Sequence, residues 1–193
     1  MPFFDEPEPP PRRQQRRLRR DEHGRPTLFV PGYLSEDVVL AVSDEVAVVM
    51  QGIACYPRGF AFELATTSRY EVPLDEEDQE DLHGAFGLWR PRRPSARFGI
   101  EYSDGRRATL GENWSPMRSM PAKEQLSIEP GGGGGGAGHW AQELWVQPLP
   151  PAGPVTFAVE WPSRGIDETL HTIDGELFRQ SADRARDVFP PRR

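Results

Sequence analysis

The chain has 193 residues, a formal net charge of −7 and a hydrophobic content of 36%, which fits one core of moderate size and argues against general affinity for nucleic acid. Its 21 Pro and 19 Gly favour many turns and short strands over long helices. The one cysteine, Cys55, excludes an intrachain disulfide and predicts a reducing, cytoplasmic setting.

Residues 1–26 are rich in proline and charge, and they predict a disordered tail ahead of a single domain over residues 27–190. They lack the apolar segment of a signal peptide, and no later run has the length of a membrane span, so we expect no membrane association. A basic block in this tail contains no acid and can make electrostatic contacts with nucleic acid or with an acidic surface. The block consists of Arg12, Arg13, Arg16, Arg17, Arg19 and Arg20.

Two apolar runs, Val38–Val42 and Val46–Cys55, flank a polar turn and predict adjacent strands. Both parities of Val46–Cys55 are largely apolar, which is typical of a central strand covered on two sides. A turn at Pro57–Gly59 joins Val46–Cys55 to Phe60–Thr67, so these two runs predict a hairpin.

Residues 71–94 and 111–125 predict long loops, because they carry charge and proline without strand periodicity. Between them, Arg97–Ser103 alternates apolar and polar residues as a half-buried strand does. Asp104-Gly105 favours a two-residue hairpin turn, since both positions tolerate positive φ, and Arg106–Leu110 is the expected return strand.

A glycine run, Gly131–Gly136, follows the short predicted strand Leu126–Glu129. No Lys-Ser/Thr pair follows it, and it leads into a β-like segment, so the phosphate-binding and dinucleotide-binding patterns both lack their required context. Because glycine runs readily behave as coil, we expect a flexible, glycine-rich surface loop between strands.

The clearest β pattern spans Trp140–Pro162. Trp140–Val146 is a β-prone run, a Pro-rich turn at Pro148–Pro154 follows, and Pro162 removes a backbone donor and ends the second strand. This arrangement predicts a hairpin. The apolar residues that alternate with polar ones in its second strand are Val155, Phe157, Val159 and Trp161.

Near the C-terminus, Glu168–Ile173 predicts one more strand, and Asp174 is a candidate N-cap for a helix over residues 174–189. Together the elements predict a mostly β fold: a single antiparallel two-sheet β-sandwich, or a partly open barrel, with one C-terminal α-helix. The apolar stripe that indicates the helix contains Phe178, Ala182, Ala185 and Phe189.

Several short motifs occur in a fixed order along the chain. They are Ala54–Phe62, Phe98–Arg106, the glycine run, Trp145–Pro154, Glu160–Ile166 and Ile173–Gly175. As a set they resemble a group of uncharacterised actinobacterial proteins, and the resemblance covers roughly residues 30–190. It implies one domain in a bacterial setting and carries no activity, ligand or active site.

The sequence predicts no catalytic, cofactor-binding or metal-ligating set, because its four histidines lack metal-ligand spacing and no nucleophile motif accompanies them. The candidate interaction surface lies in the predicted hairpin. Trp140 and Trp145 have opposite strand parity, so one is expected inside and the other is a candidate exposed contact for a partner. Glu160, on the polar face of the second strand, is a candidate member of the same surface.

These observations favour a non-catalytic β-sandwich that binds a protein partner or itself. One alternative is a small-ligand-binding protein or enzyme whose pocket is formed by loops 71–94 and 111–125. The other is a nucleic-acid accessory protein that uses the arginine-rich tail.

Overall fold

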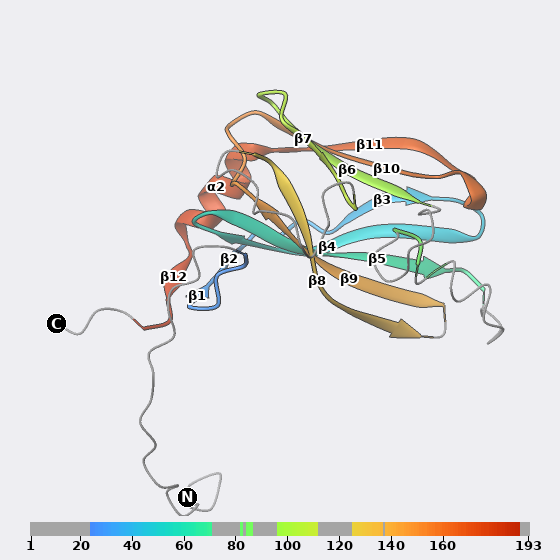
Figure 1. The fold of residues 1–193 in the computed structure, drawn as a ribbon, viewed down its shortest axis with the longest axis horizontal. Helices are drawn as coiled ribbons and strands as arrows, with labels where there is room; N and C mark the ends of the chain where they lie inside the picture. Colours follow the sequence, from blue (N-terminus) through green and yellow to red (C-terminus); the bar gives the residue numbers. More distant parts are fainter. Residues whose placement is uncertain are drawn as a thin grey trace, which may run out of the picture.

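Two β-sheets stack face to face, and neither closes into a barrel (Figure 1). This arrangement confirms the mostly β fold with a C-terminal helix. The computed structural model describes residues 24–70, Leu82, 84–86, 96–111, 125–136 and 138–189. The predicted basic block and most of the two predicted loops therefore lie outside the described residues.

The larger sheet has six strands in the order β2-β4-β5-β9-β8, and β3 also pairs with β4. Its central hairpin, β4 with β5, is the one that the sequence predicts. The strands are β2 (Gly32–Tyr33), β3 (Val38–Val42), β4 (Val46–Tyr56), β5 (Gly59–Ser68), β8 (Ser127–Gly136) and β9 (His139–Gln147).

The smaller sheet has four strands in the order β11-β10-β6-β7. A hairpin joins β6 to β7 as predicted, but the predicted two-residue turn is wrong. The Tyr102 N–H donates to the Arg106 carbonyl, so the connection has three residues, Ser103–Gly105, and Gly105 has a φ of 85° there. The elements are β6 (Arg97–Tyr102), β7 (Arg107–Thr109), β10 (Pro154–Trp161), the 3-10 helix η1 (Pro162–Arg164) and β11 (Ile166–Asp174).

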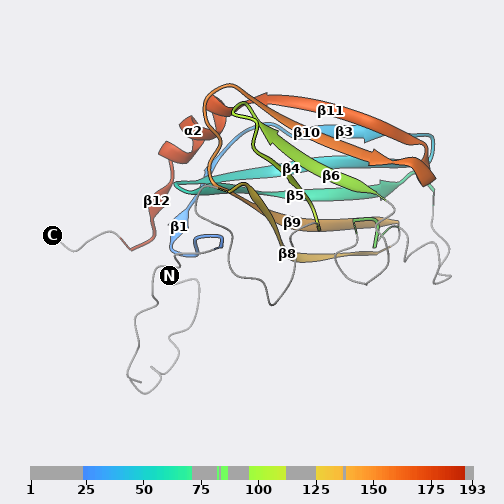
Figure 2. The same cartoon turned by 45° about the horizontal axis from the view of Figure 1, so that its top comes forward.

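The C-terminal helix α2 spans Gly175–Asp183 and lies at one end of the two sheets (Figure 2). Asp174 caps it as predicted, because its Oδ1 accepts a hydrogen bond of 2.9 Å from the Glu176 N–H. The prediction that the helix continues to residue 189 is wrong. The chain instead forms β12 (Arg186–Asp187), which pairs with β1 (Phe29–Val30) in a third, two-stranded sheet.

The core lies between the two larger sheets and is rich in phenylalanine. Phe157 of β10 is fully buried, and its ring centroid lies 6.2 Å from that of Phe62 and 6.4 Å from that of Phe60. Burial of one such side chain contributes about 1.5–3 kcal/mol. The predicted alternation of β10 is confirmed, since its inward residues are all 1% exposed or less: Val155, Phe157, Val159 and Trp161.

Segments outside the sheets close the core at its two ends. At one end, the Phe178 ring of α2 lies 4.6 Å from that of Phe60. At the other, the Phe86 ring lies 6.4 Å from that of Phe98 and 6.5 Å from that of Trp161. Within the predicted loop 71–94, the described residues Leu82, Ala85 and Phe86 are thus part of the core.

The predicted hairpin over Trp140–Pro162 is wrong, although both of its strands exist. β9 pairs with β5 and β8, whereas β10 pairs with β6 and β11, so the two strands belong to different sheets. The connecting segment between Gln147 and Pro154 contains three prolines and Gly153. Proline has no N–H to donate to a ladder, so this segment crosses between sheets and does not form a tight turn.

The predicted glycine loop is also wrong, because Gly131–Gly136 forms the second half of strand β8. It pairs with β9 in register from Gly133 opposite Gln142 to Gly136 opposite His139. Glycine has little intrinsic preference for a strand, so the pairing depends on β9 as a template.

Candidate functional site

The two predicted tryptophans lie on opposite faces of the larger sheet. Trp140 shares its parity with Leu144, on the face toward the core, and is half-buried. Trp145 lies on the outer face but is only 4% exposed. Tyr56 packs edge-on against it with ring centroids 5.6 Å apart, and Phe29 joins the same cluster. The outward tryptophan is therefore covered.

Glu160 belongs to the other sheet, and its carboxylate accepts a hydrogen bond from Arg97 Nε. This hydrogen bond and the charge of Glu160 raise the pKa of Arg97 above its ordinary value. Since Trp145 and Glu160 point outward from different sheets, Trp140, Trp145 and Glu160 do not form one surface.

A shallow depression of about 360 Å³ lies on the outer face of the larger sheet, over the glycine half of β8. We call it the glycine depression. Glu63 of β5 and Glu143 of β9 are directly opposite each other in the strand register and line one side of it. The other residues that line it, Gly132, Gly133, Gly134 and Ala141, have little or no side chain.

Each glutamate of the glycine depression has a hydrogen-bonding partner. Gln51 Nε2 donates to Glu63 Oε1 at 2.6 Å. Arg25 Nη1 donates to Glu143 Oε2, and Arg25 Nε donates to the Tyr56 hydroxyl at 2.9 Å. Burial alone would lower the pKa of Arg25, but the hydrogen bonds to Glu143 and Tyr56 outweigh it and raise the pKa.

The side chain of Gln142 holds the glycine half of β8 in place. It is 2% exposed, and its Nε2 donates to the carbonyls of Gly131 at 2.8 Å and Gly132 at 3.1 Å. The register of β8 on β9 shifts between Pro130 and Gly133. Gln142 therefore satisfies carbonyls that the irregularity removes from the regular ladder.

Strand β8 forms one edge of the larger sheet, since among the described residues it pairs with β9 alone. It has ten residues, whereas the edge strand β7 of the smaller sheet has three. The other edge of the smaller sheet, β11, has nine residues and carries the exposed acids Asp167 and Glu168. Over Gly131–Gly136 the β8 edge carries no side chain at all.

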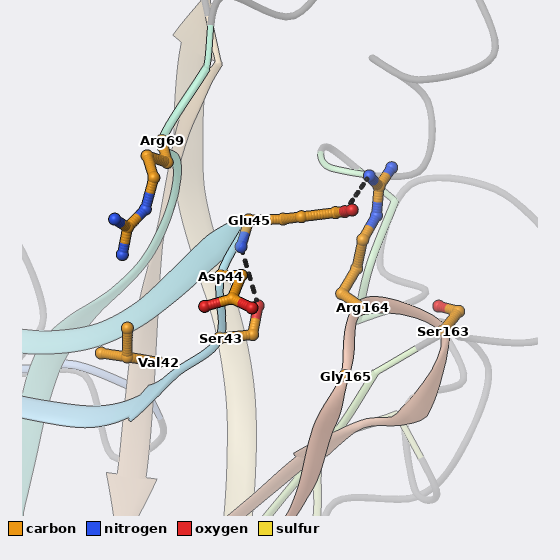
Figure 3. A pocket seen from close by; sticks show the side chains of 8 residues that line it. All are labelled: Val42, Ser43, Asp44, Glu45, Arg69, Ser163, Arg164 and Gly165. Carbon is orange, nitrogen blue, oxygen red and sulfur yellow. Dashed lines mark hydrogen bonds and ion pairs between the residues drawn. The ribbon is translucent and has the colours of Figure 1, made fainter.

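A second depression, of about 570 Å³, lies where the β3–β4 turn faces η1. Figure 3 shows Glu45 and Arg164 pointing toward one another across it, with Arg69 directed away from the pair. Arg164 Nη1 lies 3.3 Å from Glu45 Oε2, which links the two sheets. No His or Cys lines this depression, and its charges are of both signs.

The described residues bring together no group of three or more His, Cys, Asp or Glu side chains that could hold a metal ion. Cys55 is buried, and burial raises the pKa of its thiol to about 12. The neutral thiol is a poor nucleophile. His139, at the end of β9, lies with its Nδ1 3.0 Å from the Thr67 hydroxyl and is exposed.

Comparisons of the chain with protein-family models, with the curated proteins and with the solved structures found no match. They leave the resemblance to actinobacterial proteins as a prediction. Among the described residues, no helix has both the length and the apolar character needed to cross a membrane. The predicted tail, the basic block and a pocket between loops 71–94 and 111–125 lie largely or wholly outside the described residues.

The sequence-based prediction missed the glycine depression and the β8 edge. One signal was available. The register of Gly136 opposite His139 leaves a two-residue connection, and Gly138 within it has a φ of 82°. A two-residue connection containing Gly, directly before the β-prone Trp140–Val146, is typical of a hairpin. This hairpin pattern would have assigned the glycine run to a strand.

Proposed function

We propose that this protein is a non-catalytic binding protein that takes up an extended segment of another polypeptide at the β8 edge. The observation that carries the proposal is the edge itself. β8 is ten residues long, pairs on one side only among the described residues, and has six consecutive glycines.

An edge strand presents a row of unpaired N–H and C=O groups, which an incoming strand can satisfy. Most proteins protect such edges with charged side chains, proline or bulges. Here Pro130 and the irregularity that follows it affect only the middle of β8. From Gly133 to Gly136 the ladder is regular, and no side chain obstructs an approaching chain.

Binding is favoured over catalysis by what lines the two depressions. Neither the glycine depression nor the depression at the β3–β4 turn has a His or Cys among its lining residues. Carboxylates in both depressions serve ion pairs, since Glu45 is paired with Arg164 and Glu143 with Arg25.

Selection from a displayed library of random ten-residue peptides tests the proposal. Enriched peptides should bind the wild-type protein and protect the amides of Gly131–Gly136 from hydrogen exchange. The double variant Gly132→Lys/Gly134→Lys should bind them at least about tenfold more weakly, because charged side chains on an edge oppose strand addition. Both positions have open space where the Cβ would lie, so the variant should fold.

A matched control is Glu168→Lys on β11, which changes the formal charge by the same amount at an exposed position of the other sheet. It should retain wild-type affinity. The proposal fails if the double variant binds the selected peptides as tightly as the control does. It also fails if no peptide is enriched and light scattering shows a monomer at all concentrations.

A further inference from the structure

The glycine depression has a charge that the described residues do not neutralise. Glu63 and Glu143 lie directly opposite each other across β5 and β9, and like charges in that position repel. Glu143 has a cation, Arg25. Glu63 is half-buried and has the neutral Gln51 amide as its partner, so among the described residues it has no counter-ion.

An arginine already occupies the rim of this depression. Arg25 contacts Glu143 and the Tyr56 hydroxyl, and its guanidinium lies 5.7 Å from the centre of the Tyr56 ring. Arg25 is the second of the described residues, which begin at Gly24. The described chain therefore enters the fold beside the depression.

We propose that the chain's own basic segment, residues 12–20, lies across the glycine depression and supplies the missing counter-ion to Glu63. The inference goes beyond the proposed function and does not depend on it. Residues 1–23 lie outside the described residues, and the inference concerns where this segment binds.

The segment has the reach that the proposal requires. From Arg25 to Arg20 there are five residue steps, and an extended chain spans about 3.3–3.6 Å per residue, or roughly 17 Å in all. Arg25 is already in contact with one of the two glutamates that line the depression. The nearest arginines of the basic block can therefore reach the other.

Charge and shape fit an arginine better than other side chains. The basic block contains six arginines and no acid, within a chain whose net charge is −7. A planar guanidinium can donate two parallel hydrogen bonds to one carboxylate. The glycines leave its stem room to lie on the sheet, since Gly132 and Gly134 have no atom within 4 Å of where a Cβ would be.

The experiment uses four full-length proteins and one labelled peptide with the sequence of residues 10–22. The proteins are the wild type, a variant in which the six arginines of the basic block are replaced by Gln, and that variant with either Glu63→Gln or, as a control, Glu168→Gln. Binding of the peptide is followed by fluorescence anisotropy at low and at high salt. Hydrogen exchange reports on β8 and β9 without the peptide.

The peptide should bind the six-Gln variant at least about tenfold more tightly than the wild type, whose own segment already occupies the depression. High salt should weaken this binding, since it screens exposed charges. Adding Glu63→Gln should reduce the affinity about tenfold, whereas Glu168→Gln on the other sheet should leave it unchanged. Exchange at Gly131–Gly136 should be faster in the six-Gln variant than in the wild type.

Equal affinity of the peptide for the wild type and the six-Gln variant would overturn the inference, as would no effect of Glu63→Gln. A segment that instead docks on a second copy would make the protection depend on concentration and would appear as a dimer in light scattering, which also overturns the intrachain arrangement. Loss of peptide-library binding at the β8 edge would not affect this result, so the two proposals fail separately.

Discussion

Strands β10 and β8 are specified in opposite ways. In β10 the residues themselves carry the information, because every second side chain is apolar and ends in the core. In the glycine half of β8 there are no side chains, and the strand is placed by the ladder of β9 and by the Gln142 amide. The first kind of strand can be recognised from its own sequence, whereas the second depends on its neighbour.

Truncation of Phe157, which removes side-chain packing from β10, should destabilise the protein most. Its ring is fully buried among the rings of Phe60, Phe62 and Phe98. Phe157→Ala should lower the free energy of unfolding by about 3–5 kcal/mol, through lost burial and the cavity that remains. Urea denaturation followed by tryptophan fluorescence measures this loss.

The neighbouring solvent-facing position of β10 provides the control for that variant. Thr156 is half-buried, and its replacement by Ser should change stability by no more than about 0.5 kcal/mol. A loss at Phe157→Ala below about 1 kcal/mol would contradict the packing described for this core.

A second test of the packed core uses pH. Burial raises the pKa of the Cys55 thiol from 9.0 to about 12, so the unfolded chain loses this proton at a lower pH than the folded chain does. The stabilisation is complete below pH 9.0 and is lost as pH rises toward about 12, by about 1.4 kcal/mol per pH unit for one group.

Urea denaturation at pH 7, 9 and 10 measures this slope, and Cys55→Ala should flatten it. The interval ends at pH 10 because burial also raises the pKa of Tyr102, whose ordinary value is 10.0. The glycine half of β8 carries no titratable side chain, so the slope reports on the core. The same slope in Cys55→Ala as in the wild type would contradict the burial of this thiol.

Much of the fold could be predicted because its signals are local. The alternation in β10, the hairpin around Asp104-Gly105 and the Asp174 cap each involve residues a few positions apart, and each is confirmed. The end of the helix could not be read in this way. Phe189 continues the apolar stripe but is 71% exposed, because the chain turns away to pair with β1.

The choice of strand partners could not be predicted, because it depends on the whole sheet. β9 and β10 are each recognisable as strands. However, β9 pairs with β5, which is distant in sequence, and with β8, whose second half has no side chains. The covered position of Trp145 also depends on tertiary contacts, since Tyr56 and Phe29 come from other elements. The glycine depression was missed for the same reason: its two glutamates lie on different strands.

Replacement of Gln142 should weaken the pairing of the glycine half of β8 with β9. Gln142→Leu keeps a buried side chain of similar size but leaves the carbonyls of Gly131 and Gly132 without its amide. Loss of these partly buried hydrogen bonds should cost about 0.5–1.5 kcal/mol. Hydrogen exchange should show the loss chiefly in Ser127–Gly136, while Cys55 stays unreactive toward iodoacetamide.

This result would separate local opening of β8 from global unfolding, since Cys55 lies in the core and is fully buried. Gln51→Leu serves as the comparison, because that amide also bonds to a neighbouring strand but does not contact β8. Faster alkylation of Cys55 in Gln142→Leu would show that the glycine strand and the core open together, and the two strands would then not be independent.

Two adjacent glycines of β8 provide the last comparison, and one of them has the smallest expected effect. At Gly135 a Cβ would lie 2.0 Å from the backbone oxygen of His139, whereas at Gly134 it would meet no atom within 4 Å. Gly135→Ala should therefore destabilise by about 1–3 kcal/mol, because a backbone group must move. Gly134→Ala should stabilise by about 0.4–1 kcal/mol, because Ala reduces the conformational entropy of the unfolded chain. Urea midpoints of the two variants measure this difference, and equal midpoints would show that the run behaves as coil and not as a paired strand.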